Sequence, residues 1–329
     1  MEKRILFLDF FRGFAILHMI FWQIFDFFAK VNIYSTPPFY SIFLGMPVNG
    51  IGVGFFAFIS GFSIYLSINK RKEEPKSQII NHLFKRYGTY ILLALILSLW
   101  AFNFSTFYMW NEAVQGIALS ALIAGILLIS FKSVYPPTIF AIIIIMSQKF
   151  LRDLALNYPS LNIILNPLFN GFFSLAHLLP ISLAGALIAY LYLNFKKDKF
   201  LNYSLWICLI TLLHSLFAHI LTTQINYDQR SSSYLTFIIG ISILFLLVTY
   251  LIIKQNPFSE AISLFGQTAL FAYFVHFALI FKPLQLIGLT NIFSTTISVF
   301  IAIILTIMLY FLSKEWLKLK EKNKWKLVF

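Results

Sequence analysis

The chain has 329 residues, of which 60% are hydrophobic, 19% aromatic and only 11% charged. This composition excludes a soluble globular domain, because the surface of such a domain must be wetted by polar side chains. The formal net charge of +13 is typical of a nucleic-acid-binding protein only if the basic residues gather on one surface, so their positions decide its meaning.

Apolar runs of about twenty residues recur along the chain, and each is long enough to cross a bilayer. We therefore predict an all-α, polytopic transmembrane helix bundle of about ten helices, with no soluble domain between spans. Pro136 and Pro137 open the fifth span, where missing backbone N–H groups are tolerated. The predicted spans are 5–29, 47–69, 87–105, 113–131, 134–151, 171–195, 200–223, 234–253, 261–282 and 291–313.

The Lys and Arg positions set the orientation, since loops on the cytoplasmic side carry an excess of basic residues. With the N-terminus inside, Arg12 lies in the membrane and five of the 25 basic residues fall outside: Lys30, Lys149, Arg152, Arg230 and Lys282. The others fall inside, which predicts that both termini are cytoplasmic and argues against nucleic acid as a partner. A second interpretation is that some of these cations also attract an anionic cytosolic ligand. We expect residues 1–313 to form the membrane domain and 314–329 a basic cytoplasmic tail at anionic lipid head groups.

The first span, "FLDFFRGFAILHMIFWQIFDFF", carries polar residues that are costly in hydrocarbon. At 100° per residue, Asp9, Arg12, Gln23 and Asp26 share an arc of roughly 100°, and His18 lies off that arc. Asp9 and Asp26 are about 26 Å apart along the helix, so the polar stripe nearly spans the membrane. Ionisable groups in a bilayer usually face a bundle interior or a wet path. Mutual neutralisation of Asp9 and Arg12 is the alternative, but it does not explain Gln23 and Asp26.

The ninth span, "LFGQTALFAYFVHFALIF", places Tyr273 and His276 on one helix face, three residues apart. A neutral histidine in the membrane can accept or donate a proton near pH 7, although it can equally be a core histidine bonded to another helix. No metal site is predicted, because the histidines lack chelating spacing and Cys208 is the single cysteine.

The run "LDFFRGFAILHMIFWQ" resembles the first helix of integral membrane acyltransferases, most closely the heparan-α-glucosaminide N-acetyltransferase family. Asp9, Arg12 and Gly13 match its Asp and Arg-Gly pattern, and Gln23 occupies the position of an Asn or His. "FFAFISGFSIYLS" is similar to the family's Phe-rich second helix, ending in Ser60 and Gly61. "FKRYGTYILLALI" resembles the basic start of its third helix, which includes Lys85 and Arg86. "LFGQTALFAYFVHFALI" resembles a late helix with Tyr and His, here Tyr273 and His276.

This resemblance implies an acyltransferase that moves an acetyl group from cytosolic acetyl-CoA, bound without a metal, to an acceptor near the outer face. It implies a cell-membrane location, with an amino sugar, glycan or lipid-linked acceptor and membrane lipids as partners; a homodimer is one alternative for the oligomeric state. Asp26 or His276 is then the expected base, Gln23 an oxyanion or acceptor ligand, and Tyr273 a neighbour of His276. The donor would be held by Asp9, Arg12, Lys85, Arg86, Ser60 and Gly61.

Three departures from the family pattern keep other functions open. Gln23 and Gln267 replace residues that are often His and Arg, and residues 19–81 contain no histidine for a covalent acetyl intermediate. The first alternative is a transporter or flippase for a polar or lipid-linked solute, because the polar stripe of the first helix also suits a transport path. The second alternative is an inactive relative that acts as a membrane scaffold.

Overall fold

The structure is a computed structural model, and it describes residues 5–30, 51–101, 113–158, 160, 165, 168–169, 173–221 and 231–322. Within these residues the secondary structure is helical, apart from one isolated β-bridge between Ala29 and Phe293. Helices are the expected solution for an apolar chain, because lipid offers no hydrogen bonds to backbone groups. The predicted all-α class is confirmed.

Eight helices among the described residues are long and apolar enough to cross a membrane, judged by length and composition. The chain is therefore an all-α polytopic membrane protein. These spans are Ile51–Lys70 (α3), Lys76–Trp100 (in α4), Ala113–Phe131 (α6), Leu175–Asn194 (α10), Lys197–Ala218 (in α11), Ser232–Ile252 (α12), Ala269–Leu286 (α14 to α15) and Thr296–Lys322 (in α16). The first predicted span is the helix α1 (Leu6–Phe28), and the fifth contains the shorter apolar helix α7 (Tyr135–Met146).

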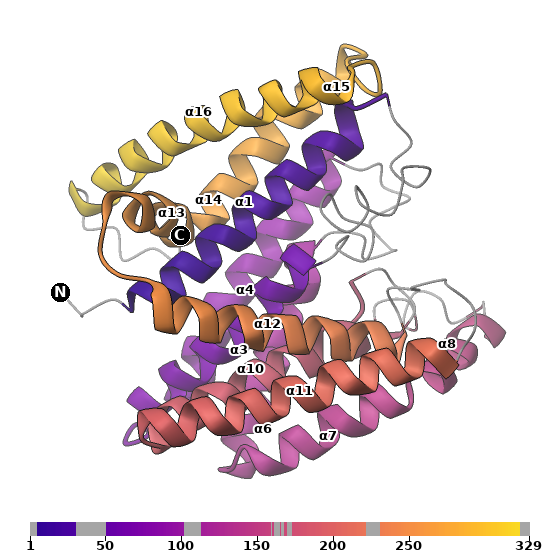
Figure 1. Cartoon of the computed structure of the whole chain (residues 1–329), viewed down its shortest axis with the longest axis vertical. Coiled ribbons are helices and arrows are strands. Elements are labelled where there is room, and N and C mark those ends of the chain that lie inside the picture. Colours follow the sequence, from indigo (N-terminus) through magenta and orange to yellow (C-terminus); the bar gives the residue numbers. More distant parts are fainter. Residues whose placement is uncertain are drawn as a thin grey trace. The chain divides into compact units, whose positions relative to one another are not determined.

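The chain divides into two compact units, and the first contains residues 1–52 and 248–329. In this unit α1 packs mainly against α13 (Pro257–Gln267), and also against α14 (Ala269–Phe274) and α16 (Thr295–Lys322). Figure 1 shows α1, α14 and α16 extending along one another. The bridge at Ala29 and Phe293 joins the end of α1 to the segment just before α16, so these two ends lie on one side.

The predicted ninth span, 261–282, is not one helix. It breaks after Gln267: α13 ends there, and a second run begins at Ala269 and continues through α14, the π-helix η4 (Val275–Phe281) and α15 (Lys282–Leu286). Asn256 caps α13, because its side chain accepts a hydrogen bond from the backbone N–H of Ser259 while the Ser259 hydroxyl accepts one from the backbone N–H of Asn256. The spanning segment is therefore Ala269–Leu286, and α13 is a separate short helix.

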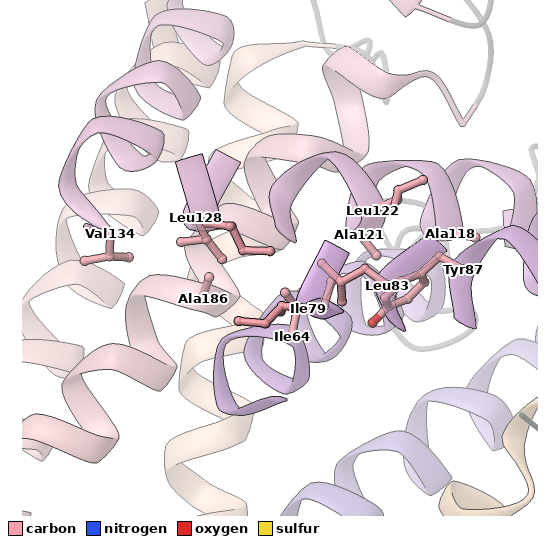
Figure 2. Packing of buried hydrophobic residues seen from close by; sticks show 11 residues of the cluster. Ile64, Ile79, Leu83, Tyr87, Ala118, Ala121, Leu122, Leu128, Val134 and Ala186 are labelled. Atoms are coloured by element: carbon pink, nitrogen blue, oxygen red, sulfur yellow. The ribbon is translucent and has the colours of Figure 1, made fainter. Parts of the chain in front are cut away.

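The second unit contains residues 53–247. Its α6 packs against α4 (Lys76–Ala101) and α10, and α10 packs against α7 and α11 (Lys197–Leu221). Figure 2 shows one cluster of its core, where Ile64 of α3, Leu83 of α4, Ala121 of α6 and Ala186 of α10 meet. The amphipathic helix α8 (Gln148–Asn157) follows α7, and its Gln148 donates to the carbonyl of Ala176 at 2.6 Å.

Small residues let α3 and α10 approach closely in this unit. A Cβ atom at Gly61 would meet the backbone carbonyl of Ser182, and one at Gly185 would meet that of Phe58. The Ser182 hydroxyl lies 3.0 Å from the carbonyl of Ala57. Close packing around small residues, with hydroxyls bonded to neighbouring helices, is the usual way in which helices associate in a membrane.

Candidate functional site

The first unit holds His276 of η4 against Gln23 of α1. The His276 side chain is fully buried, its Nδ1 lies 2.8 Å from the carbonyl oxygen of Ala272, and its Nε2 lies 2.5 Å from Oε1 of Gln23. Because a carbonyl oxygen only accepts, Nδ1 carries the proton of that first hydrogen bond. The imidazole is therefore fixed in orientation, with Nε2 directed at the polar side of α1.

Aromatic rings surround this imidazole. The rings of Tyr273 and Phe281 meet it edge-on, with centroids 5.3 Å and 5.2 Å away, and Phe28 of α1 contacts Phe281 in turn. The predicted neighbourhood of Tyr273 and His276 is therefore present. The π-helical geometry of η4 was not predicted; such turns occur often at functional sites, because they shift side chains away from their α-helical positions.

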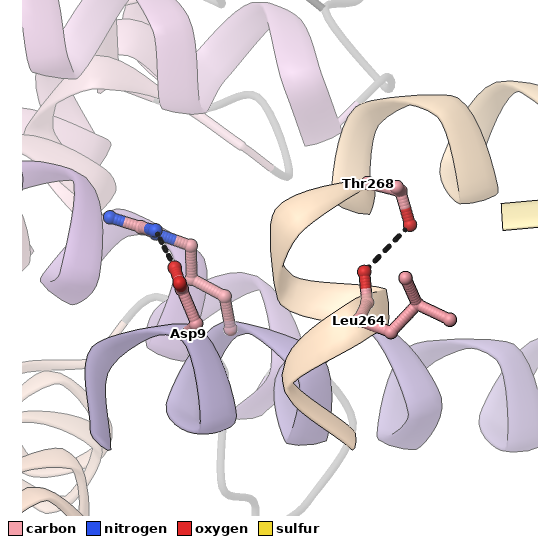
Figure 3. Close-up of polar contacts among 4 residues, drawn as sticks. Asp9, Leu264 and Thr268 are labelled. Atoms are coloured by element: carbon pink, nitrogen blue, oxygen red, sulfur yellow. Dashed lines mark hydrogen bonds and ion pairs between the residues drawn. The ribbon is translucent and has the colours of Figure 1, made fainter. Parts of the chain in front are cut away.

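A second polar group lies nearer the start of α1. Arg12 donates to the carboxylate of Asp9 at 2.8 Å, as the spacing of three residues predicts. The side chain of Asp9 is only 9% exposed and that of Arg12 is 27% exposed. Figure 3 shows Asp9 on α1 with its hydrogen-bonded partner, and α13 with Leu264 and Thr268 beside it. Asp9 therefore orients the Arg12 guanidinium within a largely buried setting.

Two glycines bring α13 against this part of α1. A Cβ atom at Gly13 would meet the backbone carbonyl of Ile262, and one at Gly266 would meet that of Asp9. Sequence reasoning identified Gly13 by its place in the Arg-Gly pair but missed Gly266. The signal available was the small residue within "LFGQT", where the apolar run is interrupted.

The two polar groups of α1 occupy different levels of the first unit. Gln23 is 14 residues beyond Asp9, which is about 21 Å along the helix. Asp26 lies in the last part of α1, and its side chain falls outside the described residues. A long substrate could contact both levels, with the Asp9–Arg12 pair at one end and the Gln23–His276 pair at the other.

The remaining predicted residues belong to the second unit. Ser60 and Gly61 lie in α3, where Gly61 forms the close approach to Ser182. Lys85 is exposed near the start of α4, and the guanidinium carbon of Arg86 lies 5.6 Å from the ring centre of Tyr87. The structure therefore gives Gly61 a packing role, while the expected donor contacts of these residues stay predictions.

The residues that the structure describes contain no group of three His, Cys, Asp or Glu side chains that could hold a metal ion. A histidine that offers one basic nitrogen, next to an amide, can accept a proton from a nucleophile. A guanidinium held by a carboxylate can bind an anion such as a phosphate.

Comparison with known families links these residues to a reaction class. The family profile described as "Heparan-alpha-glucosaminide N-acetyltransferase, catalytic" matches residues 4–206, a range that includes Asp9, Arg12 and Gln23 and ends before His276. No curated protein matches the sequence. Because the profile covers well over half of the 329 residues, the chain belongs to the heparan-α-glucosaminide N-acetyltransferase catalytic family of membrane acetyltransferases.

Proposed function

We propose that this protein is an acetyl-CoA-dependent acetyltransferase of the cell membrane. It takes the acetyl group from cytosolic acetyl-CoA and transfers it to an amine or hydroxyl near the outer face, on an amino sugar, a glycan or a lipid-linked sugar. Membership of the acetyltransferase family supports the reaction class. The polar stripe along α1 supports a path between the two faces, because ionisable groups in a membrane often mark such a path.

The observation that carries the proposal is the pairing of His276 with Gln23 in the first unit. His276 acts as the general base: the acceptor attacks the thioester carbonyl, its proton passes to Nε2, and the C–S bond breaks. The proton then passes to the departing thiolate, so the products are free CoA and the acetylated acceptor. Asp26, three residues beyond Gln23, is the second candidate for the base.

Gln23 and Tyr273 complete the acceptor side of the proposed site. The Gln23 amide donates a hydrogen bond to the oxyanion of the tetrahedral intermediate or positions the acceptor. Tyr273 lies against the His276 ring and limits its movement. Holding nucleophile and thioester together is a large part of catalysis in any direct transfer between two bound substrates.

The donor side uses the cationic residues. In the first unit Arg12, held by Asp9, is the candidate to bind a CoA phosphate, to which an arginine can donate two parallel hydrogen bonds. In the second unit Lys85 and Arg86 are separate candidates for a phosphate contact. Ser60 and Gly61 are proposed to contact the pantetheine arm. No metal takes part in the proposed reaction, since the base and the hydrogen-bond donors provide its chemistry.

The direct test is calorimetric titration of acetyl-CoA into the detergent-purified protein. We expect binding in the micromolar range that weakens in Arg12→Ala and Arg86→Ala, and that stays unchanged in Arg152→Ala, an arginine predicted to lie on the outer side. Absence of binding by the folded protein, with no short acyl-CoA raising its thermal stability, would overturn the proposal and favour transport or a scaffold role.

A further inference from the structure

Both ring nitrogens of His276 lie in hydrogen bonds, and counting their protons limits what Gln23 can do. Nδ1 donates to the carbonyl of Ala272, so a neutral imidazole has no proton on Nε2. Nε2 is then an acceptor, and its partner must donate. Gln23 has both kinds of group at the end of one side chain: an oxygen that accepts and an NH₂ that donates.

A half-turn about the last bond of the Gln23 side chain exchanges these two groups at almost the same position. With its NH₂ toward His276, the amide donates to Nε2 of the neutral ring. With Oε1 toward His276, the orientation in the structure, where Oε1 lies 2.5 Å from Nε2, the amide can accept from the Nε2–H of an imidazolium. One side chain can therefore satisfy both protonation states of one histidine.

Because His276 is buried among aromatic rings, the ability of Gln23 both to donate and to accept a hydrogen bond affects which charge state of the imidazole is stable. The ring is fully buried and is lined by Tyr273, Phe277 and Phe281. Its ring nitrogens contact the backbone of Ala272, with that of Tyr273 close by, and the side chain of Gln23, and no ion pair of His276 is found in the described part of the chain. An unsatisfied imidazolium in such a setting is costly, so its stability depends on an acceptor at each nitrogen: the Ala272 carbonyl at Nδ1 and the Gln23 oxygen at Nε2. Two titratable residues are neighbours in sequence of His276 or Gln23: Tyr273, and Asp26 of α1, whose side chain is outside the described residues.

We propose that Gln23 is a reversible hydrogen-bond partner of Nε2, which donates to the neutral, Nδ1-protonated ring of His276 before reaction and accepts from the imidazolium during it. Its catalytic consequence rests on the proposed function. The acceptor N–H or O–H replaces the amide as the donor to Nε2, and the acceptor proton moves to Nε2 as the new C–N or C–O bond forms. The amide turns and Oε1 accepts from Nε2–H until the proton passes to the thiolate. Gln23 is thus a positioning residue that acts through His276.

The test is nitrogen NMR of the full-length protein labelled with ¹⁵N-histidine, in detergent and without any acyl donor. The His276 signals are identified by their loss in His276→Asn. In the wild-type protein we expect a neutral ring with the proton on Nδ1. In Gln23→Glu the carboxylate accepts from Nε2, so both nitrogens should become protonated at neutral pH. In Gln23→Leu the ring should stay neutral with its proton on Nδ1, fixed by Ala272.

Gln115→Glu is the matched control, since Gln115 is a buried amide of the second unit that donates to Ser98 at 2.8 Å. It should leave the His276 signals unchanged, and Asp26→Asn should leave the response to Gln23→Glu intact. A wild-type ring protonated on Nε2 alone, or unchanged signals in Gln23→Glu, would overturn the inference. The measurement needs no turnover, so it fails or succeeds independently of acetyl transfer: an active enzyme with the wrong tautomer contradicts the inference alone.

Discussion

At the scale of single residues, the Asp9–Arg12 pair is the clearest electrostatic feature of the first unit. Both side chains are mostly buried, and the 2.8 Å contact is a charge-assisted hydrogen bond. Such bonds contribute more to stability when water is excluded, because burying a charge without its partner is costly. The pair therefore stabilises α1 and also prepares the guanidinium for an anion.

Replacing Arg12 by methionine keeps much of the side-chain length but removes the charge. We expect a loss of about 1.5–3 kcal/mol in the free energy of unfolding, because Asp9 loses a charged hydrogen-bond partner. Thermal or denaturant unfolding in detergent measures it. The double variant with Asp9→Asn should lose less than the sum of the two single variants; additive losses would show that the pair is not coupled.

The residue pattern of α1 was readable from the sequence, but its partners were not. The helical period places Asp9, Arg12 and Gln23 on one arc, and the structure brings Gln23 of that arc against His276 of η4. The contact between Gln23 and His276 joins positions 253 apart, and no local period encodes such a pairing. The contact depends on how the late helices fold back against α1, including the π-helix η4 that contains His276.

At the scale of elements, close helix approach depends on glycines with no room for a side chain. Gly13 and Gly266 serve α1 and α13, and Gly61 and Gly185 serve α3 and α10. In each case the atom that a Cβ would meet is a backbone carbonyl, which cannot move like a flexible side chain. The sequence showed small residues in these spans but not which of them face another helix.

Gly266→Ala should destabilise the protein by about 1–3 kcal/mol, the usual cost of forcing an extra methyl into a packed site. Its Cβ meets the backbone of Asp9. Gly88→Ala in α4 is the control, since nothing lies within 4 Å of a Cβ there, and it should be neutral or stabilising by up to about 1 kcal/mol. Equal melting temperatures for the two variants would refute the close α1–α13 contact.

Gly61→Ala separates the two roles considered for that glycine. A Cβ at Gly61 meets the backbone of Ser182, so we expect the melting temperature to fall in the absence of any acyl donor. If stability is unchanged and acetyl-CoA affinity alone is lost, Gly61 acts by contacting the donor and the packing explanation is wrong. Gly88→Ala again serves as the control.

The break after Gln267 shows the limit of reading spans from hydropathy. Residues 261–282 are mostly apolar and the sequence predicts one helix there, yet α13 ends at Gln267 and α14 begins at Ala269. The Thr268 hydroxyl bonds the carbonyl of Leu264, which satisfies a backbone group at the end of α13. No proline marks the break, and the helix before it, α13, packs against α1.

At the scale of the whole molecule, the sequence correctly predicted an all-α membrane protein, since the length of apolar runs is fixed by bilayer thickness. The helix α16 continues from Thr295 to Lys322, through the boundary predicted between residues 313 and 314. The division into a membrane domain and a basic tail stays a prediction, as does the cytoplasmic position of both termini.

The orientation is tested by labelling single cysteines in intact cells with a membrane-impermeant maleimide. In a Cys208→Ser background, which removes the buried thiol, we expect Glu73→Cys to react only after the membrane is permeabilised. Ile287→Cys, at a site that is 69% exposed beyond η4, should react in intact cells. The reverse pattern would invert the topology and move the donor to the other face.

The central claim is acetyl transfer with His276 as the base. The most direct measurement is release of free CoA from acetyl-CoA by the purified protein, with glucosamine as acceptor, in wild-type, His276→Asn and the control His214→Asn. We predict acceptor-dependent release that falls by about 10²–10⁴-fold in His276→Asn, with acetyl-CoA binding retained, and that persists in His214→Asn. Full activity in a folded His276→Asn protein would contradict the assignment of the base. If the wild-type protein binds no acetyl-CoA and releases none with this or any other amine or hydroxyl acceptor, it is not an acetyltransferase.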